Sequence, residues 1–382
     1  MTFQDMRASA HPRRPFHQLQ HPREVVRQFT PNWFAATMGT GILSIALSAT
    51  PFHALGAALW MANICLFTLF ALLYAARWLV YFDEARRIFD HSVVSMFLGC
   101  IPMGLATILN GFLIYGTAHL GQTAVTIAQT LWWIDAGMAA ACGIAIPYMM
   151  FTRQSHSVEQ MTAVWLLPMV AAEVAAVSGG MLAPHMATAD MQMIVLSLSY
   201  VLWALSVPIA MSVIVVLVLR LAIHKLPHAS MASTSWLALG PIGTGALGLM
   251  TLGQAAPAIL QAQGLGHLGA TAAGIGAIGG LLMWGYGLWW FLMAALITQR
   301  YLREGLPFNL GWWGYTFPIG VYAVATYKLG AVFDVSVIGG AANLMGSLLV
   351  GLLAVVWGVV CLRTIRGAWR GDLFFAPCIA RN

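Results

Sequence analysis

The chain has 382 residues, of which 60% are hydrophobic and only 8% are charged, against roughly 25% charged in an ordinary soluble domain. The 18 Lys and Arg and 12 Asp and Glu residues cannot cover the surface of a soluble domain of this length, so the composition excludes that class. The net charge of +6 is no nucleic-acid signature, because the arginines fall in short clusters between apolar runs.

The first 30 residues are a polar segment with several arginines and histidines and no apolar core. A cleavable signal has a short basic part followed by an apolar core. We therefore expect residues 1–30 to form a cytoplasmic tail. The five cysteines contain no C-x-x-C pair, which argues against a disulfide framework and a zinc site. We expect neither metal nor cofactor.

Ten apolar stretches follow, each about as long as a membrane span requires. Their predicted limits are 33–49, 56–80, 93–115, 124–150, 162–183, 191–219, 236–259, 269–297, 309–327 and 337–362. The connections are too short for a soluble domain. The sequence therefore predicts an all-helical transmembrane domain over 31–366, followed by a cytoplasmic tail over 367–382.

The lysines and arginines orient these spans. All of them except Lys328 fall on one side of the predicted membrane, when the spans are counted from the N-terminus. Basic loops face the cytoplasm. We therefore expect both termini in the cytoplasm, an even number of spans and a multi-pass protein of the plasma membrane.

The odd-numbered spans share a short pattern near the start or middle of each apolar run. Its five copies are Thr37-Met38-Gly39, Pro102-Met103-Gly104, Pro168-Met169-Val170, Pro241-Ile242-Gly243 and Pro318-Ile319-Gly320. Each repeat is then a helical hairpin, and all odd spans run in one direction. Such helices close most simply into a quasi-fivefold ring around a passage. Proline would kink each helix, and small residues beside it would either allow close packing or widen a pore.

One position of the repeat differs in an informative way. The residue that precedes the repeated pattern is Ala36, Ile101, Leu167, Gly240 and Phe317 in turn. Only the last of these is aromatic. If this layer faces the axis, Phe317 would close the passage as a hydrophobic gate.

Three stretches carry a resemblance to a known family. They are the segment from Phe29-Thr30-Pro31-Asn32-Trp33-Phe34 into Met38-Gly39-Thr40-Gly41, the span from Leu166-Leu167-Pro168 to Ser178-Gly179-Gly180, and Gly311-Trp312-Trp313-Gly314-Tyr315-Thr316-Phe317-Pro318. Together they resemble the tellurite-resistance/dicarboxylate transporter family, which includes bacterial tellurite-resistance proteins, fungal malate and sulfite transporters and plant slow anion channels. The likeness covers nearly all of 29–365.

The resemblance implies ten spans arranged as five hairpins around a central pore, a homotrimer with one pore per subunit, and passage of anions gated by Phe317. The Met-Gly-Thr-Gly stretch is more similar to the malate and sulfite branch than to the plant channels. The residues that we expect at the pore kinks and lining are Gly39, Thr40, Gly41, Pro102, Gly104, Pro168, Pro241, Gly243, Pro318 and Gly320.

Asp135 and Glu173 are the acidic residues deep within apolar runs. Ionisable residues inside spans are functional candidates, and a buried carboxyl group could carry a proton. However, Glu173 is rotated by about 240° from Leu167 on a regular helix. An inter-helix hydrogen bond or a subunit contact is the alternative for Glu173, and a structural role is the alternative for Asp135.

No arginine or lysine falls in the middle of a predicted span, which favours a neutral-walled pore. On the predicted outer side, each loop contains one titratable cation or histidine. These residues are His53, His119, His185, His267 and Lys328. They could form an outer vestibule whose positive charge grows below about pH 6.5.

These patterns favour a transporter or channel for small anions, with C4-dicarboxylates such as malate or succinate as the first expectation. The alternatives are a sulfite or tellurite-type exporter and a channel for chloride or nitrate. An intramembrane enzyme is a remote alternative, because no predicted span contains a histidine or a catalytic cluster at mid-depth.

Overall fold

The structure is a computed structural model that describes residues 15–379. The expectations for the tail residues Arg7, His11, Arg13, Arg14 and Arg381 lie outside this part of the chain. Between residues 15 and 379 every regular element is a helix, and there is no strand. The prediction of an all-helical protein is confirmed.

Eight helical stretches of the described chain are long and apolar enough to cross a membrane. Five of them are single helices: α3 (His53–Val80), α7 (Gln122–Thr152), α9 (Ala189–His224), α11 (Gly266–Glu304) and α13 (Val337–Arg370). The other three stretches combine several elements. Val94–Leu120 contains η3, α5 (Cys100–Gly111), the π-helical turn η4 (Phe112–Gly116) and α6 (Thr117–Leu120); Ala163–His185 runs from η5 to η6 and contains α8 (Leu167–Leu182); Ala229–Ala262 contains η7 and α10 (Leu239–Ala262). The other two expected spans fall on α2 (Phe34–Leu47) and α12 (Thr316–Val332), which have 14 and 17 residues.

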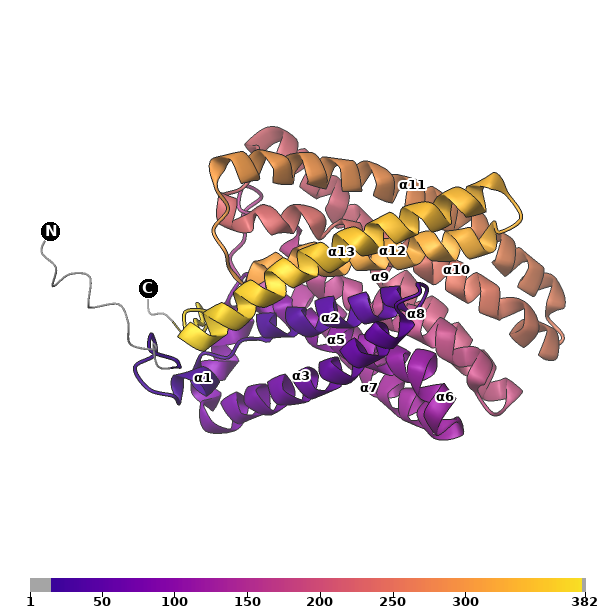
Figure 1. The fold of residues 1–382 in the computed structure, drawn as a ribbon, viewed down its shortest axis with the longest axis horizontal. Helices are drawn as coiled ribbons and strands as arrows, with labels where there is room; N and C mark the ends of the chain where they lie inside the picture. The colour runs from indigo at the N-terminus through magenta and orange to yellow at the C-terminus, as the bar shows by residue number, and fades with distance from the viewer. Residues whose placement is uncertain (1–14, 380–382) are drawn as a thin grey trace, which may run out of the picture.

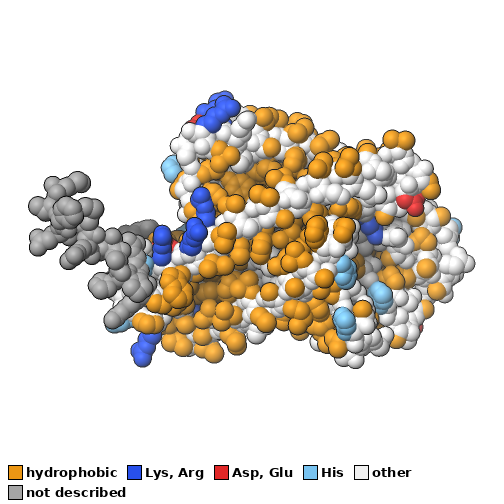
Figure 2. All heavy atoms as spheres, in the orientation of Figure 1, with side chains coloured by type: hydrophobic (Ala, Val, Ile, Leu, Met, Phe, Trp, Pro, Cys, Tyr) orange, Lys and Arg blue, Asp and Glu red, His pale blue; other side chains and the backbone are white. Residues whose placement is uncertain are grey.

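The spans divide into two classes by burial. In the stretches that contain α5, α8 and α10, between 72% and 94% of the central residues are buried, whereas this share is 22–33% in α3, α7, α9, α11 and α13. All positions of α2 except Ile45 are also buried. We call α2, α5, α8, α10 and α12 the inner helices, and α3, α7, α9, α11 and α13 the outer helices. Apolar side chains such as Leu79 and Phe151 are exposed on the outer helices. Figure 2 shows hydrophobic side chains spread over the face of the molecule, as expected of a surface in contact with lipid.

Each inner helix packs against the outer helix that follows it in the chain, so α2 pairs with α3, α5 with α7, α8 with α9, α10 with α11, and α12 with α13. Among the inner helices, α2 contacts α5 and α12, α8 contacts α5 and α10, and α10 contacts α12 (Figure 1). The helical hairpins expected from the repeat are therefore the units of the fold.

A 3-10 segment precedes every inner helix. These segments are η1 (Pro31–Trp33), η3 (Val94–Gly99), η5 (Ala163–Leu166), η7 (Ala229–Trp236) and η8 (Leu310–Tyr315). Each contacts the next one along the chain, and η8 contacts η1. All five inner helices therefore begin at the same end of the molecule. We call it the terminal end, because both described ends of the chain lie there (Figure 1), and we call the opposite end the far end.

The repeated prolines lie at the junctions between these 3-10 segments and the α-helices. Pro168 is in the first turn of α8, and Pro102, Pro241 and Pro318 are each the third residue of their α-helix. In this first turn the N–H that proline lacks would have no partner within the α-helix. These prolines therefore mark where each α-helix starts within its span, and the kinks that we expected there stay a prediction.

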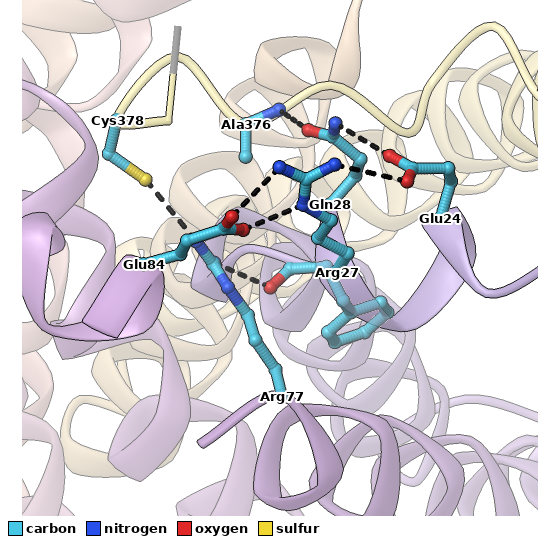
Figure 3. Close-up of polar contacts among 8 residues, drawn as sticks. Glu24, Arg27, Gln28, Arg77, Glu84, Ala376 and Cys378 are labelled. Atoms are coloured by element: carbon cyan, nitrogen blue, oxygen red, sulfur yellow. Dashed lines mark hydrogen bonds and ion pairs between the residues drawn. The ribbon is translucent and has the colours of Figure 1, made fainter. Parts of the chain in front are cut away.

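The chain ends pack against the terminal end of the bundle. In Figure 3, Arg77 of α3 donates to the carbonyl oxygen of Phe29 at 2.7 Å and to Cys378 Sγ at 3.4 Å. The backbone N–H of Ala376 donates to Gln28 Oε1 at 2.8 Å. Short elements carry the remaining contacts there: α1 (Glu24–Arg27), α4 (Phe82–Ala85) and η2 (Arg86–Asp90). The described parts of both predicted tails are thus ordered onto the helices.

Candidate functional site

Two cavities lie between the inner helices. The terminal cavity has a volume of about 360 Å³, and the far cavity has a volume of about 340 Å³. All five inner helices line both of them. The terminal cavity is lined, among others, by Met38, Met103, Val170, Gly240 and Pro318. The far cavity is lined, among others, by Ile42, Thr107, Val174, Thr244 and Val321, which lie about one helical turn further along the same helices.

Phe317 stands between the two cavities. Within the described chain it is the one residue that lines both of them, and its side chain is 5% exposed. The other members of its predicted layer are placed unequally. Leu167 and Gly240 line the terminal cavity, whereas Ala36 and Ile101 line neither. An aromatic ring between two largely apolar chambers can act as a hydrophobic constriction.

The start of α12 is fixed by side-chain hydrogen bonds, and this fixes Phe317. Asn309 Oδ1 accepts the backbone N–H of Gly311 at 2.8 Å and so caps η8. Trp313 Nε1 donates to Thr364 Oγ1 of α13 at 3.1 Å, and Thr316 Oγ1 donates to the carbonyl oxygen of Trp313 at 2.8 Å. The ring of Phe317 is thus carried on a backbone anchored to an outer helix.

The small residues of the repeated pattern serve helix packing. A methyl group on Gly320 would lie 2.6 Å from Ile42 Cγ2, and one on Gly39 would lie 2.6 Å from Trp313 Cε3. Thr40 accepts a hydrogen bond from Trp357 of α13 at 3.0 Å. Of the residues predicted to line the pore, Pro318 lines a cavity, whereas the others line neither of the two; these are Gly39, Thr40, Gly41, Pro102, Gly104, Pro168, Pro241, Gly243 and Gly320.

Glu173 and Asp135 are completely buried, and none of their carboxyl oxygens has a hydrogen-bond partner in the described chain. Neither lines a cavity. Glu173 precedes Val174, which does line one, so on the helix its side chain is turned about 100° away from that lining position. Asp135 faces the interior from the outer helix α7. Proton transfer through these groups stays a prediction, and their positions favour the alternative of a role between helices.

The four predicted vestibule histidines lie on the surface at the far end of the molecule. His53, His119, His185 and His267 are all exposed, and none of them lines either cavity. Within residues 15–379 no three His, Cys, Asp or Glu side chains are grouped as a metal site would require. The outer vestibule that these histidines would form stays a prediction.

Lys328 differs from them, because its side chain lines the far cavity. The helix α12 continues to Val332, beyond the predicted end of the span at residue 327, and this places Lys328 on the helix rather than in a loop. The expectation of a wholly neutral wall is therefore wrong at this position. Its ammonium group donates to Gln254 Oε1 of α10.

Two further groups of lining residues were missed by the sequence analysis. Asn110 and Thr244, both buried, line the far cavity, and one side-chain oxygen of each lacks a hydrogen-bond partner. Their polarity inside apolar runs of odd spans was the one sequence signal, and it does not distinguish them from residues that bond to their own backbone. Asp372, Leu373 and Phe375 of the C-terminal segment line the terminal cavity, and the aromatic run at Phe374 could have suggested that this segment packs.

Phe374 shows how the C-terminal segment is attached. Its ring stacks on Trp33 with centroids 4.9 Å apart, and Trp33 is buried against Phe29 and Phe70. Figure 3 shows the polar part of the same attachment, at Gln28 and Arg77. The C-terminal segment therefore covers part of the mouth of the terminal cavity.

Comparison with known proteins finds a family of anion channels and relatives that are named as transporters or efflux pumps. The profile of the family described as voltage-dependent anion channel matches residues 28–365. The sulfite efflux pump of Arthroderma benhamiae is 35% identical, over 94% of this chain and 98% of the relative. An uncharacterized transporter of Methanocaldococcus jannaschii is 26% identical over 92% and 96%, and the malic acid transport protein of Schizosaccharomyces pombe is 20% identical over 92% and 81%.

Proposed function

The chain belongs to the voltage-dependent anion channel family, and from that membership we propose that small anions cross the membrane between its inner helices, past Phe317. The family is one of multi-pass transporters and channels, which fits a non-enzymatic role. The path runs from the terminal cavity to the far cavity. Phe317 is the gate between them.

The observation that carries this proposal is the pair of cavities on the two sides of one aromatic ring. Residues from all five inner helices line each cavity, and Phe317 lines both. The contacts of α2 with α5 and α12, and of α8 and α10 with their neighbours, support a ring of five parallel inner helices. With the five outer helices this makes ten spans in a quasi-fivefold arrangement around the path.

Among small anions, sulfite is the substrate that the comparisons favour over a C4-dicarboxylate. The relatives named as sulfite efflux pumps reach 35% identity over nearly the full length of both chains, whereas the relative named for malic acid is 20% identical. Our first expectation from the sequence was malate or succinate. Malate is kept as the second candidate because that relative also covers most of this chain.

We further propose that the terminal end faces the cytoplasm of a plasma-membrane protein. Except for Lys328, the described lysines and arginines belong to the terminal end, and Figure 2 shows the blue side chains mainly on that side. Cytoplasmic loops carry such an excess of positive charge. A homotrimer with one path per subunit stays a prediction from the family resemblance.

Transport by the purified, full-length protein in liposomes tests the proposed function. We expect sulfite and chloride to pass faster than malate, and all three faster than in protein-free vesicles. Equal rates with and without the protein for every anion would contradict the proposed function. If malate passed faster than sulfite, malate would become the first candidate substrate and sulfite the second.

A further inference from the structure

Lys328 introduces a positive charge into an otherwise uncharged chamber. It lies in α12 and lines the far cavity, and in the described part of the chain no other lysine or arginine lines either cavity. The side chain is half-buried, and one of its three N–H donors goes to Gln254 Oε1 of α10. A lysine has three donors and no acceptor. The remaining donors have no carboxylate to pair with, because Lys328 takes part in no salt bridge in the described chain.

Two polar side chains of the same cavity lack partners as well. Asn110 of α5 is 6% exposed and its Oδ1 has no hydrogen bond, and Thr244 of α10 is 1% exposed and its Oγ1 has none. Both line the far cavity. A buried polar atom without a hydrogen-bond partner lowers the stability of the folded protein and is rare, so each such atom needs a physical explanation. The amide of Asn110 and the hydroxyl of Thr244 can both donate to a bound group, since the amide can be turned and the hydroxyl rotates.

These three groups come from α5, α10 and α12, on different sides of one chamber of about 340 Å³. We propose that the far cavity is a binding site for small anions such as sulfite, in which Lys328 supplies the charge and Asn110 and Thr244 supply hydrogen bonds. This inference rests on the proposed function, because it assigns a binding site on the path of the transported anion. Positive charge at a half-buried position attracts an anion more strongly than the same charge in water does.

The competing explanation is that Lys328 serves only to link α12 to α10 through its hydrogen bond to Gln254. The two explanations differ in what they require of the side chain. The inter-helix hydrogen bond needs a donor to Gln254 Oε1, which glutamine at position 328 could still provide. An anion site needs the charge, which arginine keeps and glutamine removes.

The test compares Lys328→Gln with Lys328→Arg, and uses Lys225→Gln as the matched control. Lys225 is the other lysine of the chain and is exposed at the terminal end, where its ammonium group donates to the carbonyl oxygen of Ala222. In liposomes we expect Lys328→Gln to raise the half-saturating sulfite concentration about tenfold, as for loss of a hydrogen bond to a charged group. Lys328→Arg and Lys225→Gln should stay near the wild-type value.

A second variant keeps the inference falsifiable if Lys328→Gln does not fold. Thr244→Val preserves the shape of the side chain, and it removes a hydroxyl that makes no hydrogen bond in the protein. It should fold normally and still weaken sulfite binding several-fold. Sulfite-dependent thermal stabilisation of the detergent-purified protein measures binding without transport.

The outcomes separate the inference from the proposed function. Wild-type protein that transports sulfite, with an unchanged half-saturating concentration in Lys328→Gln and Thr244→Val, would overturn the anion site alone. Wild-type protein that is stabilised by sulfite through Lys328 but transports none would support the site and overturn the proposed function. Equal losses in Lys328→Gln and Lys328→Arg would also overturn the site, since charge would then not be the property that matters.

Discussion

At the scale of single residues, the ion pair of Arg27 and Glu84 links the N-terminal segment to α4. Arg27 Nε donates to Glu84 Oε2 at 2.7 Å, and Arg27 Nη2 donates to Glu84 Oε1 at 2.8 Å (Figure 3). These hydrogen bonds hold the pKa of Glu84 below its ordinary value of 4.5. A group with a lowered pKa in the folded state adds stability above its ordinary pKa, and this contribution is lost as the pH falls through the folded-state value.

We therefore predict that Glu84→Gln lowers the melting temperature of the detergent-purified protein at pH 7. The two-bond geometry places the loss near the upper end of the range for exposed pairs, about 0.5–1 kcal/mol. The difference from wild type should shrink as the pH falls below the ordinary pKa of the carboxyl group, because the unfolded chain then takes up a proton that the ion pair opposes in the folded state. The control is Glu304→Gln, which breaks a more exposed pair with Arg300. A difference that persists unchanged at pH 3 would contradict this account.

The same scale shows what the sequence could reveal about the site. Phe317 was identifiable because it is the one aromatic residue in a repeated position. Asn110 and Thr244 were not, because isolated polar residues in apolar helices commonly bond to their own backbone, as Thr37 does to the carbonyl oxygen of Phe34. Only the packed structure distinguishes a satisfied hydroxyl from one without a partner.

At the scale of elements, glycines decide how closely the inner helices approach. A methyl group on Gly99, at the end of η3, would lie 2.9 Å from the Cα atom of Pro168 and even nearer to the carbonyl oxygen of Leu167. Both neighbours are backbone atoms, so neither can turn aside. A methyl group on Gly240 would meet no atom within 4 Å.

We predict that Gly99→Ala destabilises the protein by about 1–3 kcal/mol, as overpacking does elsewhere. Gly240→Ala should leave the melting temperature unchanged or raise it, because alanine favours the helix. Thermal unfolding of both variants in the same detergent measures the difference. Equal melting temperatures would show that the contact of η3 with α8 is looser than its geometry indicates.

The elements themselves were largely predictable. Each of the ten predicted spans overlaps a helix in the structure, because long apolar runs identify membrane helices well. Two features were not predictable. Three of the 3-10 segments, η3, η5 and η8, fall inside predicted apolar runs, and no residue pattern separates them from the α-helix that follows. The extension of α12 past residue 327 begins with Lys328, and a lysine on its own signals the end of a span.

At the scale of the whole molecule, burial separates the inner helices from the outer ones more sharply than hydropathy does. The mean hydropathy is 1.3–1.9 in the stretches that contain α5, α8 and α10 and 1.5–2.6 in the outer helices, so these ranges overlap, whereas the buried shares fall into two separate ranges. The repeat in the odd spans anticipated this division. The cover of the terminal cavity by residues 372–377 was not anticipated, because a short segment after the last span carries no periodic pattern.

The central claim is that Phe317 closes a path between two chambers. Anion flux through the full-length protein in liposomes, compared between wild type, Phe317→Ala and Phe70→Ala, tests it most directly. Phe70 is the matched control, since it is 7% exposed and lines neither cavity. The account predicts a several-fold rise in sulfite flux for Phe317→Ala and none for Phe70→Ala. A folded Phe317→Ala protein with flux equal to wild type would contradict the claim.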